Sequence, residues 1–217
     1  MSDLHDPGIW EYLLETAPEE PDLLKELNRE THVKVLKPRM LSGHYQGRFL
    51  SLLSKILNPL RILEIGTFTG YSTLCLAEGL QEKGIIYTLE ANPEPLVLAR
   101  KYFERSPLGR KIRVFEGEAL MILDNLKEKW DLVFIDADKK NNQKYFEKVF
   151  DNVRPGGLIL VDNVLWSGKI LNNQKDRKTE EIHGFNQFLH AFAGAESIIL
   201  PIRDGISLVR KKEDLYT

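Results

Sequence analysis

The sequence has little of what marks secreted, membrane or nucleic-acid-binding proteins. Its single cysteine, Cys75, cannot form an internal disulfide, which fits a reducing cytosol. No run reaches about 18 apolar residues, and the opening MSDLHDPGIW lacks the basic flank and apolar centre of a signal peptide. The formal net charge of −2 over 217 residues gives no electrostatic reason to bind nucleic acid or anionic lipid. We therefore expect a cytoplasmic protein with neither membrane nor nucleic-acid partners.

Histidine and cysteine also show no metal-binding pattern. The five histidines have no spacing such as H-E-x-x-H, so we expect them to be structural or surface residues. They are His5, His32, His44, His183 and His190. Cys75 lies in an apolar helical stretch and is expected to be a buried small side chain, not a catalytic thiol.

From Arg61 onward, strand-like and helix-like segments alternate in a way that predicts βαβ units. The expected strands are residues 61–66, 85–90, 112–117, 130–136, 156–163, 196–202 and 206–211. The helical patterns between the first five are residues 71–83, 93–106, 120–129 and 142–153. Only three residues join the last two strands, too few for a crossover, so these should form a hairpin. The fold class is therefore α/β, with a seven-stranded, mostly parallel sheet that ends in an antiparallel C-terminal hairpin.

The first sixty residues differ from the rest because their apolar positions have helical spacing and prolines interrupt them. No linker rich in glycine, serine or proline follows them. We therefore expect one domain over residues 1–217, made of a helical extension (1–60) and a core (61–217). The polar segment 166–179 is expected to be a long functional loop.

Two expected strands, 130–136 and 156–163, end abruptly in oxygen-bearing side chains. Asp136 ends the first, and Asp162 and Asn163 end the second. Ligands of open α/β sheets bind beyond the carboxyl ends of the strands, and paired strands lie roughly 4.8 Å apart. If these two strands pair, the three residues converge on one point. Hard oxygen ligands without sulfur or imidazole favour Mg²⁺, Mn²⁺ or Ca²⁺ over zinc.

A glycine-containing loop follows the first expected strand. Gly66 and Gly70 stand between this strand and a helix, where absent side chains let a ligand approach the backbone. Glu90 ends the next strand about twenty positions later, where a carboxylate can bind both ribose hydroxyls. The loop lacks the central glycine of the G-x-G-x-x-G pyrophosphate fingerprint. This pattern favours a nucleoside cofactor without a diphosphate, although a tight turn without a ligand would also explain it.

Several motifs, in order, resemble the cation-dependent, S-adenosylmethionine-dependent O-methyltransferases of the caffeoyl-CoA and catechol type. They are Glu64 to Ser72 (EIGTFTGYS), Glu90, Phe134 to Lys139 (FIDADK), Arg154 to Gly157 (RPGG) and Asp162 to Gly168 (DNVLWSG). The resemblance implies a Rossmann-like class I methyltransferase fold, a bound divalent metal such as Mg²⁺ and a homodimer. It also implies a small phenolic substrate, of which one of two adjacent hydroxyls is methylated.

The resemblance also implies residue roles. The metal ligands would be Asp136, Asp162 and Asn163. Contacts to S-adenosylmethionine fall on Met40, Ser42, Glu64, Gly66, Thr67, Ser72, Glu90, Ala119, Asp136 and Asp138. Lys139 occupies the place of the catalytic lysine, beside the ligand Asp136, and would act either as a base or as a positive charge next to the phenolate. Trp166 and Ser167 would contact the substrate, although Trp166 could instead fill core.

Three departures from the family pattern concern the substrate. Asn142 stands where a tyrosine is common, Ser167 where plant members carry a substrate-contacting asparagine, and Arg203 where a glycine is usual. They favour a small-molecule catechol over caffeoyl-CoA as substrate. The basic residues between Lys169 and Lys178 form either a solvated face or a grip for an anionic acyl carrier.

Other functions are compatible with the same fold. An N-methyltransferase or an aminopropyltransferase would use a similar sheet, but an amine nucleophile would not need the oxygen ligands. The incomplete diphosphate loop argues against a nicotinamide oxidoreductase. A catalytically silent binding protein would bind the donor without the metal.

Overall fold

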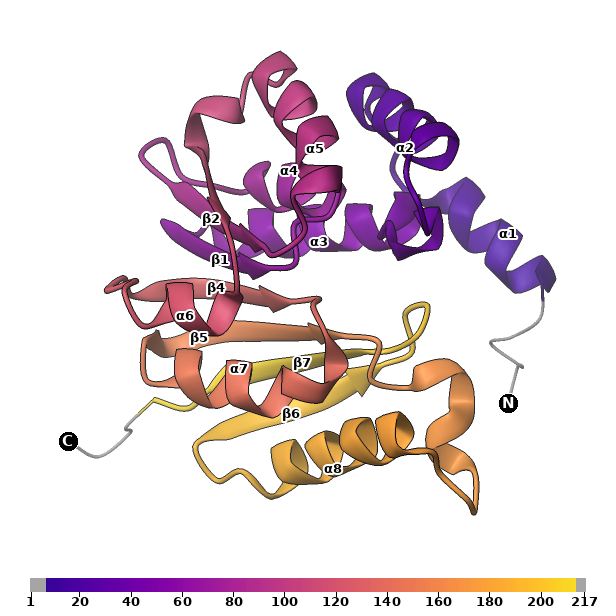
Figure 1. The fold of residues 1–217 in the computed structure, drawn as a ribbon, viewed down its shortest axis with the longest axis vertical. Helices are drawn as coiled ribbons and strands as arrows, with labels where there is room; N and C mark the ends of the chain where they lie inside the picture. Colours follow the sequence, from indigo (N-terminus) through magenta and orange to yellow (C-terminus); the bar gives the residue numbers. More distant parts are fainter. Residues whose placement is uncertain (1–6, 214–217) are drawn as a thin grey trace.

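The computed structural model describes residues 7–213, which form one central sheet flanked by helices (Figure 1). The strands are β1 (Arg61–Ile65), β2 (Ile85–Glu90), β3 (Ile112–Glu116), β4 (Trp130–Ile135), β5 (Val153–Asp162), β6 (Ala195–Leu200) and β7 (Ile206–Lys211). They lie in the order β3-β2-β1-β4-β5-β7-β6. Strands β1 to β5 pair in parallel, whereas β7 is antiparallel to both β5 and β6. The predicted seven-stranded, mostly parallel sheet with a C-terminal hairpin is confirmed.

One detail of this sheet differs from the expectation. The antiparallel strand is β7, which inserts between β5 and β6, so that β6 becomes the edge strand. Strand β5 also begins earlier than expected, at Val153, and the register between β4 and β5 shifts between Trp130 and Leu132. The irregularity allows Pro155, which has no N–H to donate, to lie within a strand.

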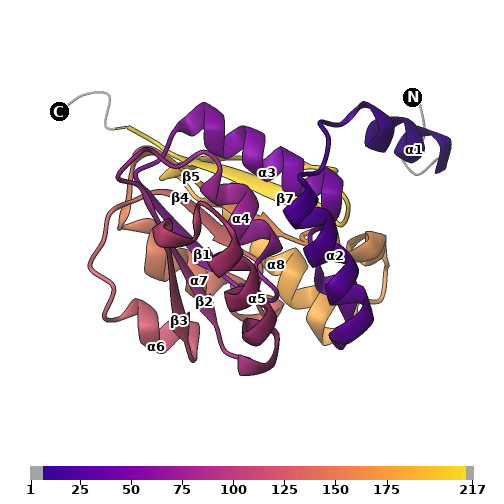
Figure 2. The ribbon, with the colours of Figure 1, turned by 90° about the horizontal axis from the view of Figure 1, so that it is seen from above.

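The helices cover both faces of the sheet. They are α1 (Pro7–Thr16), α2 (Asp22–Lys34), α3 (Gly43–Leu57), α4 (Tyr71–Ala77), α5 (Pro93–Arg105), α6 (Ala119–Leu123), α7 (Asn142–Phe150) and α8 (Arg177–Ala191). Short 3-10 helices occur at η1 (Pro38–Met40), η2 (Gly109–Lys111), η3 (Lys139–Asn141) and η4 (Trp166–Leu171). Helices α2 to α5 contribute to one apolar cluster and α6 to α8 to another. Helix α1 lies at the periphery (Figure 2).

Strand β4 shows why the central strands read as continuous apolar runs. Leu132 and Phe134 belong to the cluster under α2 to α5, whereas Val133 and Ile135 belong to the cluster under α6 to α8. All four are fully buried, because side chains alternate between two covered faces. In β4 the charged side chains therefore lie near its two ends, at Asp131 and at Asp136 just beyond the strand, where a site can form.

Helix α8 was not predicted from the sequence. Its buried residues Ile182, Phe185 and Leu189 have helical spacing, but Gly184 and several polar residues weaken the pattern. Part of the segment 166–179 that was expected to be a loop is η4 and the first turn of α8. Helices α4 and α6 are also shorter than expected, ending at Ala77 and Leu123. No helix within residues 7–213 is long and apolar enough to cross a membrane.

Glu30 links α2 to α5. Its carboxylate accepts hydrogen bonds from Lys101 Nζ at 2.6 Å and Tyr102 Oη at 2.7 Å, and it also pairs with Lys34. These bonds, led by that from Lys101, lower the pKa of Glu30 from 4.5 to about 2. The contacts therefore contribute stability that is fully present above pH 4.5 and is lost as the pH falls towards 2.

The Glu30→Gln variant is expected to unfold at a lower temperature than the unmodified protein at neutral pH, because these ion pairs are lost. The difference should shrink as the pH falls from 4.5 towards 2, and thermal unfolding across this range measures it. Glu26→Gln is the matched control, since the Glu26–Arg105 pair joins the same helices but is more exposed and should contribute less. A difference that does not change with pH would contradict this account of Glu30.

Candidate active site

The carboxyl ends of β4 and β5 bring the predicted acidic residues together. The two strands pair in parallel up to Ile135 and Val161, so Asp136 and Asp162 follow at adjacent positions. Asp162 is 2% exposed, and the Asp136 side chain is about one-fifth exposed. The predicted convergence of these strand ends is confirmed.

Both carboxylates are held by neighbouring side chains or backbone. Lys139 Nζ donates to Asp136 Oδ1 at 2.8 Å, and the Lys139 side chain is itself buried. Gln46 Nε2 donates to Asp162 Oδ2 at 2.8 Å, and the Asn163 N–H donates to Asp162 Oδ1 at 2.7 Å. Burial and the charge of Asp136 raise the pKa of Asp162, while Lys139 acts in the opposite direction. The carboxylates of Asp136 and Asp162 therefore share a poorly solvated space with the positive charge of Lys139.

The donor set at these strand ends fits a hard divalent cation. Asn163 has a backbone φ of 60°, and its side-chain amide has no hydrogen-bond partner within residues 7–213. Asp136, Asp162 and Asn163 offer only oxygen ligands, which suit Mg²⁺, Mn²⁺ or Ca²⁺. Over the same residues no group of three or more histidine, cysteine, aspartate or glutamate side chains could hold a metal. A cation here would thus depend on two carboxylates and a neutral amide.

Both glycines of the loop after β1 are required by the packing of the chain itself. Gly66 has φ of 106°, and a Cβ there would lie 2.1 Å from the carbonyl oxygen of Asp136. A Cβ at Gly70, where φ is 83°, would lie 2.5 Å from the Phe103 ring. The missing side chain of Gly66 thus lets the ends of β1 and β4 approach each other. The loop after β1 therefore lies beside the acidic cluster.

Glu64 lies at the base of this loop. It is fully buried and accepts hydrogen bonds from Ser72 Oγ and Thr88 Oγ1, both at 2.6 Å, and from Thr73 Oγ1. Burial raises the pKa of Glu64 to about 7, although the three hydroxyls counteract this shift. Thr67 is also buried and shares a hydrogen bond with Thr88. These contacts fix the shape of the loop; direct contact of Glu64, Thr67 or Ser72 with the donor stays a prediction.

Glu90 ends β2 on the other side of the same loop. Its Oε2 accepts from the Phe68 N–H at 2.8 Å, and its Oε1 accepts from the Asn92 N–H at 2.9 Å. Each carboxylate oxygen can accept a further hydrogen bond. Glu90 therefore stabilises the loop and still has acceptor capacity for the hydroxyls of a ribose.

The other predicted donor contacts differ in exposure. Ser42 and Ala119 are buried, whereas Met40 is largely exposed. Asp138 accepts from Asn141 Nδ2 at 2.6 Å and from the Tyr145 hydroxyl, so its carboxylate is already held by side chains of η3 and α7. Direct contact of these four residues with the donor stays a prediction.

The segment after Asn163 has an unusual backbone. Trp166, Ser167 and Gly168 all have positive φ, and the Ser167 N–H donates to the carboxylate of Asp204. Lys178 Nζ lies 4.3 Å from the centre of the Trp166 ring. The indole is thus held by a cation–π contact and is only half-buried, and its contact with a substrate stays a prediction.

Three residues near the site were not assigned a role from the sequence. Gln46 is fully buried in α3 and bonds Asp162, but a single glutamine in an amphipathic helix gives no signal of this contact. Arg203 donates a hydrogen bond to Gln46. In the sequence, the only sign of Arg203 was that it replaces a glycine that is usual in the family. Asn142 is 1% exposed, and neither polar atom of its side chain has a hydrogen-bond partner in the described part of the chain.

The predicted structural roles of Cys75, His32 and His44 agree with the structure. Cys75 is fully buried, and burial raises the pKa of its thiol to about 12, which is unsuited to a nucleophile. His44 Nε2 lies 2.7 Å from the Pro18 carbonyl oxygen, and His32 Nδ1 lies 2.9 Å from that of Asn28. His5 lies outside the described residues.

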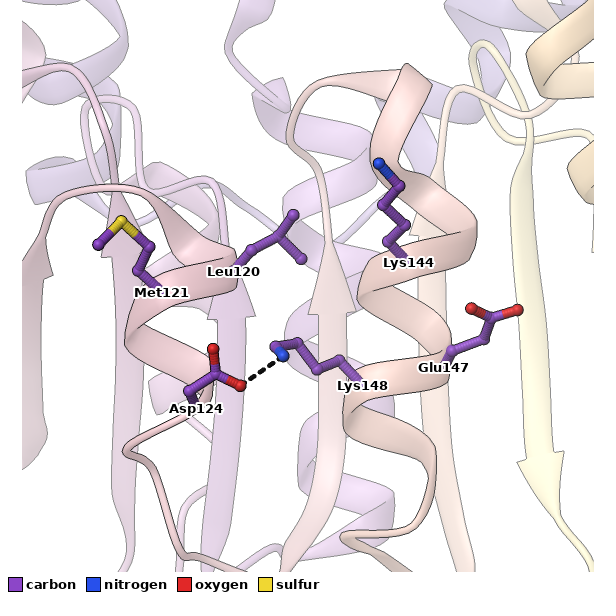
Figure 3. Close-up of a pocket in the computed structure, with 6 residues that line it drawn as sticks. All are labelled: Leu120, Met121, Asp124, Lys144, Glu147 and Lys148. Atoms are coloured by element: carbon purple, nitrogen blue, oxygen red, sulfur yellow. Dashed lines mark hydrogen bonds and ion pairs between the residues drawn. The ribbon is translucent and has the colours of Figure 1, made fainter.

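A surface hollow of about 510 Å³ lies between α6 and α7 (Figure 3). Its lining residues are Leu120, Met121, Asp124, Lys144, Glu147 and Lys148. None of them is a predicted site residue, and Asp124 and Lys148 form an ion pair with each other. The acidic cluster at the strand ends is chemically better suited to catalysis than this hollow.

Comparisons with known proteins identify relatives of this chain. An O-methyltransferase family model matches residues 14–212. Caffeoyl-CoA O-methyltransferase 1 of Nicotiana tabacum is 35% identical over 223 residues, covering 96% of this chain and 93% of that protein. The SAH complex of a Bacillus cereus O-methyltransferase is 33% identical with a TM-score of 0.86, covering 94% of this chain and 97% of that one.

A second solved structure, an SAH-bound methyltransferase of Podospora anserina, covers 98% of this chain and 99% of its own. It is 25% identical, with a TM-score of 0.90. These likenesses confirm the predicted Rossmann-like methyltransferase fold, and they favour O-methyl transfer over amino-methyl transfer, aminopropyl transfer, nicotinamide chemistry or a silent binding role. The chain belongs to the O-methyltransferase family and is an S-adenosylmethionine-dependent O-methyltransferase.

Proposed function

We propose that this enzyme transfers a methyl group to one hydroxyl of a vicinal dihydroxy aromatic compound, and that it depends on a divalent cation. The observation that carries the proposal is the pair of buried Asp162 and partly buried Asp136, with Lys139 beside it and the glycine loop adjacent. Two acidic groups in a poorly solvated space are a costly arrangement unless a cation compensates them. The caffeoyl-CoA O-methyltransferases among its relatives support the part of the proposal that concerns the acceptor.

The reaction requires a nucleophilic oxygen. Methyl transfer from a sulfonium is an in-line displacement, and a phenolic hydroxyl with a pKa of about 10 is mostly protonated at neutral pH. A cation held by Asp136, Asp162 and Asn163 would supply Lewis acidity that favours the phenolate. Lys139 is the residue that receives the phenolic proton or stabilises the resulting negative charge. Its Nζ is held 2.8 Å from Asp136 Oδ1, at the edge of the same space.

The donor occupies the loop after β1 in this proposal. Glu90 binds the ribose hydroxyls, and the backbone of Gly66 and Thr67 lies against the donor. Ser42, Ala119 and Met40 complete its surroundings, with Met40 near the sulfonium. Glu64 and Ser72 hold the shape of the loop through their mutual hydrogen bond. Asp138 contributes through the turn that it forms with Asn141.

The acceptor lies against Trp166 and Ser167 on the other side of the acidic cluster. We favour a free catechol over an acyl-CoA ester, because Ser167 is a shorter side chain than the asparagine of plant members and Asn142 replaces a tyrosine. The basic residues between Lys169 and Lys178 are mostly exposed, as on a solvated surface. A homodimer and a cytoplasmic location are further proposals that rest on the resemblance and the composition.

The test is methyl transfer from S-adenosylmethionine to a panel of acceptors. The panel contains a vicinal diphenol, its acyl-CoA ester, the corresponding monophenol and an aromatic amine. We expect turnover of the diphenol with Mg²⁺ present, slower turnover of the ester, and little or none of the monophenol and the amine. Preferred methylation of the monophenol or the amine would contradict the proposed substrate class.

The Glu90→Ala variant tests the donor site separately. Loss of hydrogen bonds to a charged group should weaken S-adenosylmethionine binding by roughly 1.5–3 kcal/mol, with a smaller effect on the KM of the acceptor. Calorimetric titration measures the donor affinity. Glu116→Ala is the matched control. Glu116 lies opposite Glu90 in the register of β2 and β3, but its side chain is half exposed and forms an ion pair with Arg100. Equal donor affinities of Glu90→Ala and the unmodified enzyme would remove Glu90 from the ribose site.

A further inference from the structure

The turn between β6 and β7 contacts the segment that precedes α3. Arg203 Nη1 donates to the Leu41 carbonyl oxygen at 2.8 Å, to the Ser42 carbonyl oxygen and to Gln46 Oε1 at 3.1 Å. Residues 41–46 and 203 are far apart in the sequence, so this side chain joins two separate parts of the fold. It is the bond to Gln46 that connects Arg203 to the acidic cluster.

Gln46 relays this contact to the proposed cation site. Its side-chain oxygen accepts from Arg203, and its side-chain nitrogen donates to Asp162 Oδ2 at 2.8 Å. Because Gln46 is fully buried, its amide is held between these two partners. The position of the Asp162 carboxylate is thus tied to Arg203 through a single side chain.

The same turn also contacts the segment on the substrate side. The Leu165 N–H donates to the Asp204 carbonyl oxygen at 2.9 Å, and the Val164 N–H donates to that of Gly205 at 3.1 Å. The Asp204 carboxylate accepts from the Ser167 N–H. One short turn therefore holds residues 41–46 on one side and residues 164–167 on the other.

The backbone of Arg203 is strained for a residue with a side chain. Its φ is 50°, in the left-handed region that glycine adopts without cost. Arg203 is also exposed, so burial of its aliphatic part does not explain its presence. Such strain persists only where the surrounding structure holds the residue in place. Here the side chain makes three hydrogen bonds that glycine would lose.

We propose that Arg203 is a positioning residue, which couples the donor-binding segment around Ser42 to the cation ligand Asp162 through Gln46. The inference rests on the proposed function for the roles of Ser42 and Asp162. Arg203 touches neither donor nor acceptor in this scheme. It fixes the carbonyl groups of Leu41 and Ser42 and, through Gln46, the orientation of one carboxylate.

Arg203→Gly separates positioning from a purely structural role. Glycine relieves the backbone strain, so the unfolding temperature should change little. The variant should nevertheless bind SAH about tenfold more weakly, because charge-assisted hydrogen bonds no longer fix the carbonyl groups of Leu41 and Ser42. It should also bind Mg²⁺ more weakly. Loss of a residue that orients a metal ligand typically lowers metal affinity roughly 10–100-fold. Calorimetric titrations with SAH alone and with Mg²⁺ alone measure both effects without reference to activity.

Further variants make the test specific. Gln46→Met should weaken Mg²⁺ binding and leave SAH binding nearly unchanged, because Arg203 keeps its bonds to the two carbonyls. Arg203→Lys should recover part of the SAH affinity through one carbonyl. Arg210→Met, on an exposed arginine of β7 that pairs with Glu196 and Glu213, should change neither affinity.

Unchanged SAH and Mg²⁺ affinities in Arg203→Gly would overturn the positioning role. So would a parallel fall of both affinities and the unfolding temperature in Arg203→Gly, Arg203→Lys and Gln46→Met, since that pattern reports general loosening. Failure of the unmodified enzyme to bind Mg²⁺ would refute the proposed cation instead. In that case unchanged SAH binding by Arg203→Gly would still overturn the inference about Arg203.

Discussion

Removal of divalent cations by a chelator is expected to abolish methylation of a vicinal diphenol, and added Mg²⁺ or Mn²⁺ should restore it. Asp136 and Asp162 lie at adjacent strand ends, and burial together with the charge of Asp136 raises the pKa of Asp162. Because ionisation of Asp162 is unfavourable beside Asp136, we expect a cation between the two carboxylates. Methyl transfer measured in metal-free buffer, with chelator and after readdition gives the result.

Asp162→Asn gives the sharper form of this prediction. The amide removes a ligand charge, so turnover should fall to the level of the chelated enzyme. It also removes a buried carboxylate whose ionised form opposes folding, so the metal-free variant should unfold at no lower temperature than the unmodified protein. Mg²⁺ should raise the unfolding temperature of the unmodified protein but not that of the variant.

The matched control is Asp124→Asn, which removes a carboxylate from the surface hollow and an ion pair with Lys148. Its activity should respond to chelator and Mg²⁺ as that of the unmodified enzyme does. Full activity of the unmodified enzyme in chelator would refute the cation requirement, and chelator-sensitive activity of Asp162→Asn at the unmodified level would remove Asp162 from the ligand set.

The strand-end cluster could be predicted because its causes are local in the sequence. Buried parallel strands are apolar on both faces, so the change from Ile135 to Asp136 and from Val161 to Asp162 marks where each strand ends. The remaining step, that β4 and β5 are neighbours, follows from the usual connection of successive parallel strands. Sequence reasoning therefore reached both the sheet and its acidic edge.

The residues that support this cluster could not be found in the same way. Gln46 lies 116 positions from Asp162, and nothing in the pattern of α3 shows that its amide faces β5. Arg203 is one residue of a turn, and its contacts join it to residues about 160 positions away in the sequence. Helix α8 was missed because tertiary burial, more than amphipathic pattern, stabilises it. Long-range packing determined each of these features.

Lys139→Met is expected to lower kcat for a vicinal diphenol far more than it raises KM. The Lys139 side chain is buried, and its Nζ is held 2.8 Å from Asp136, so it is fixed beside the proposed position of the reacting hydroxyl. Proton transfer by a positioned side chain contributes typically about 10²–10⁴-fold, and a loss in this range is expected at neutral pH. Steady-state kinetics with varied diphenol and saturating donor measure the effect.

The pH dependence of the variant and a second acceptor distinguish the roles of Lys139. Higher pH should restore part of the lost rate, because hydroxide can generate the phenolate without the lysine. Lys140→Met is the matched control, since the neighbouring Lys140 is exposed and lies 4.0 Å from Asp138, and it should leave kcat unchanged. A loss of rate in Lys139→Met that is the same at every pH would favour a purely electrostatic role for Lys139. An unchanged kcat in Lys139→Met would remove Lys139 from the mechanism. If the unmodified enzyme methylated a monophenol as fast as the diphenol, the second hydroxyl would not be needed.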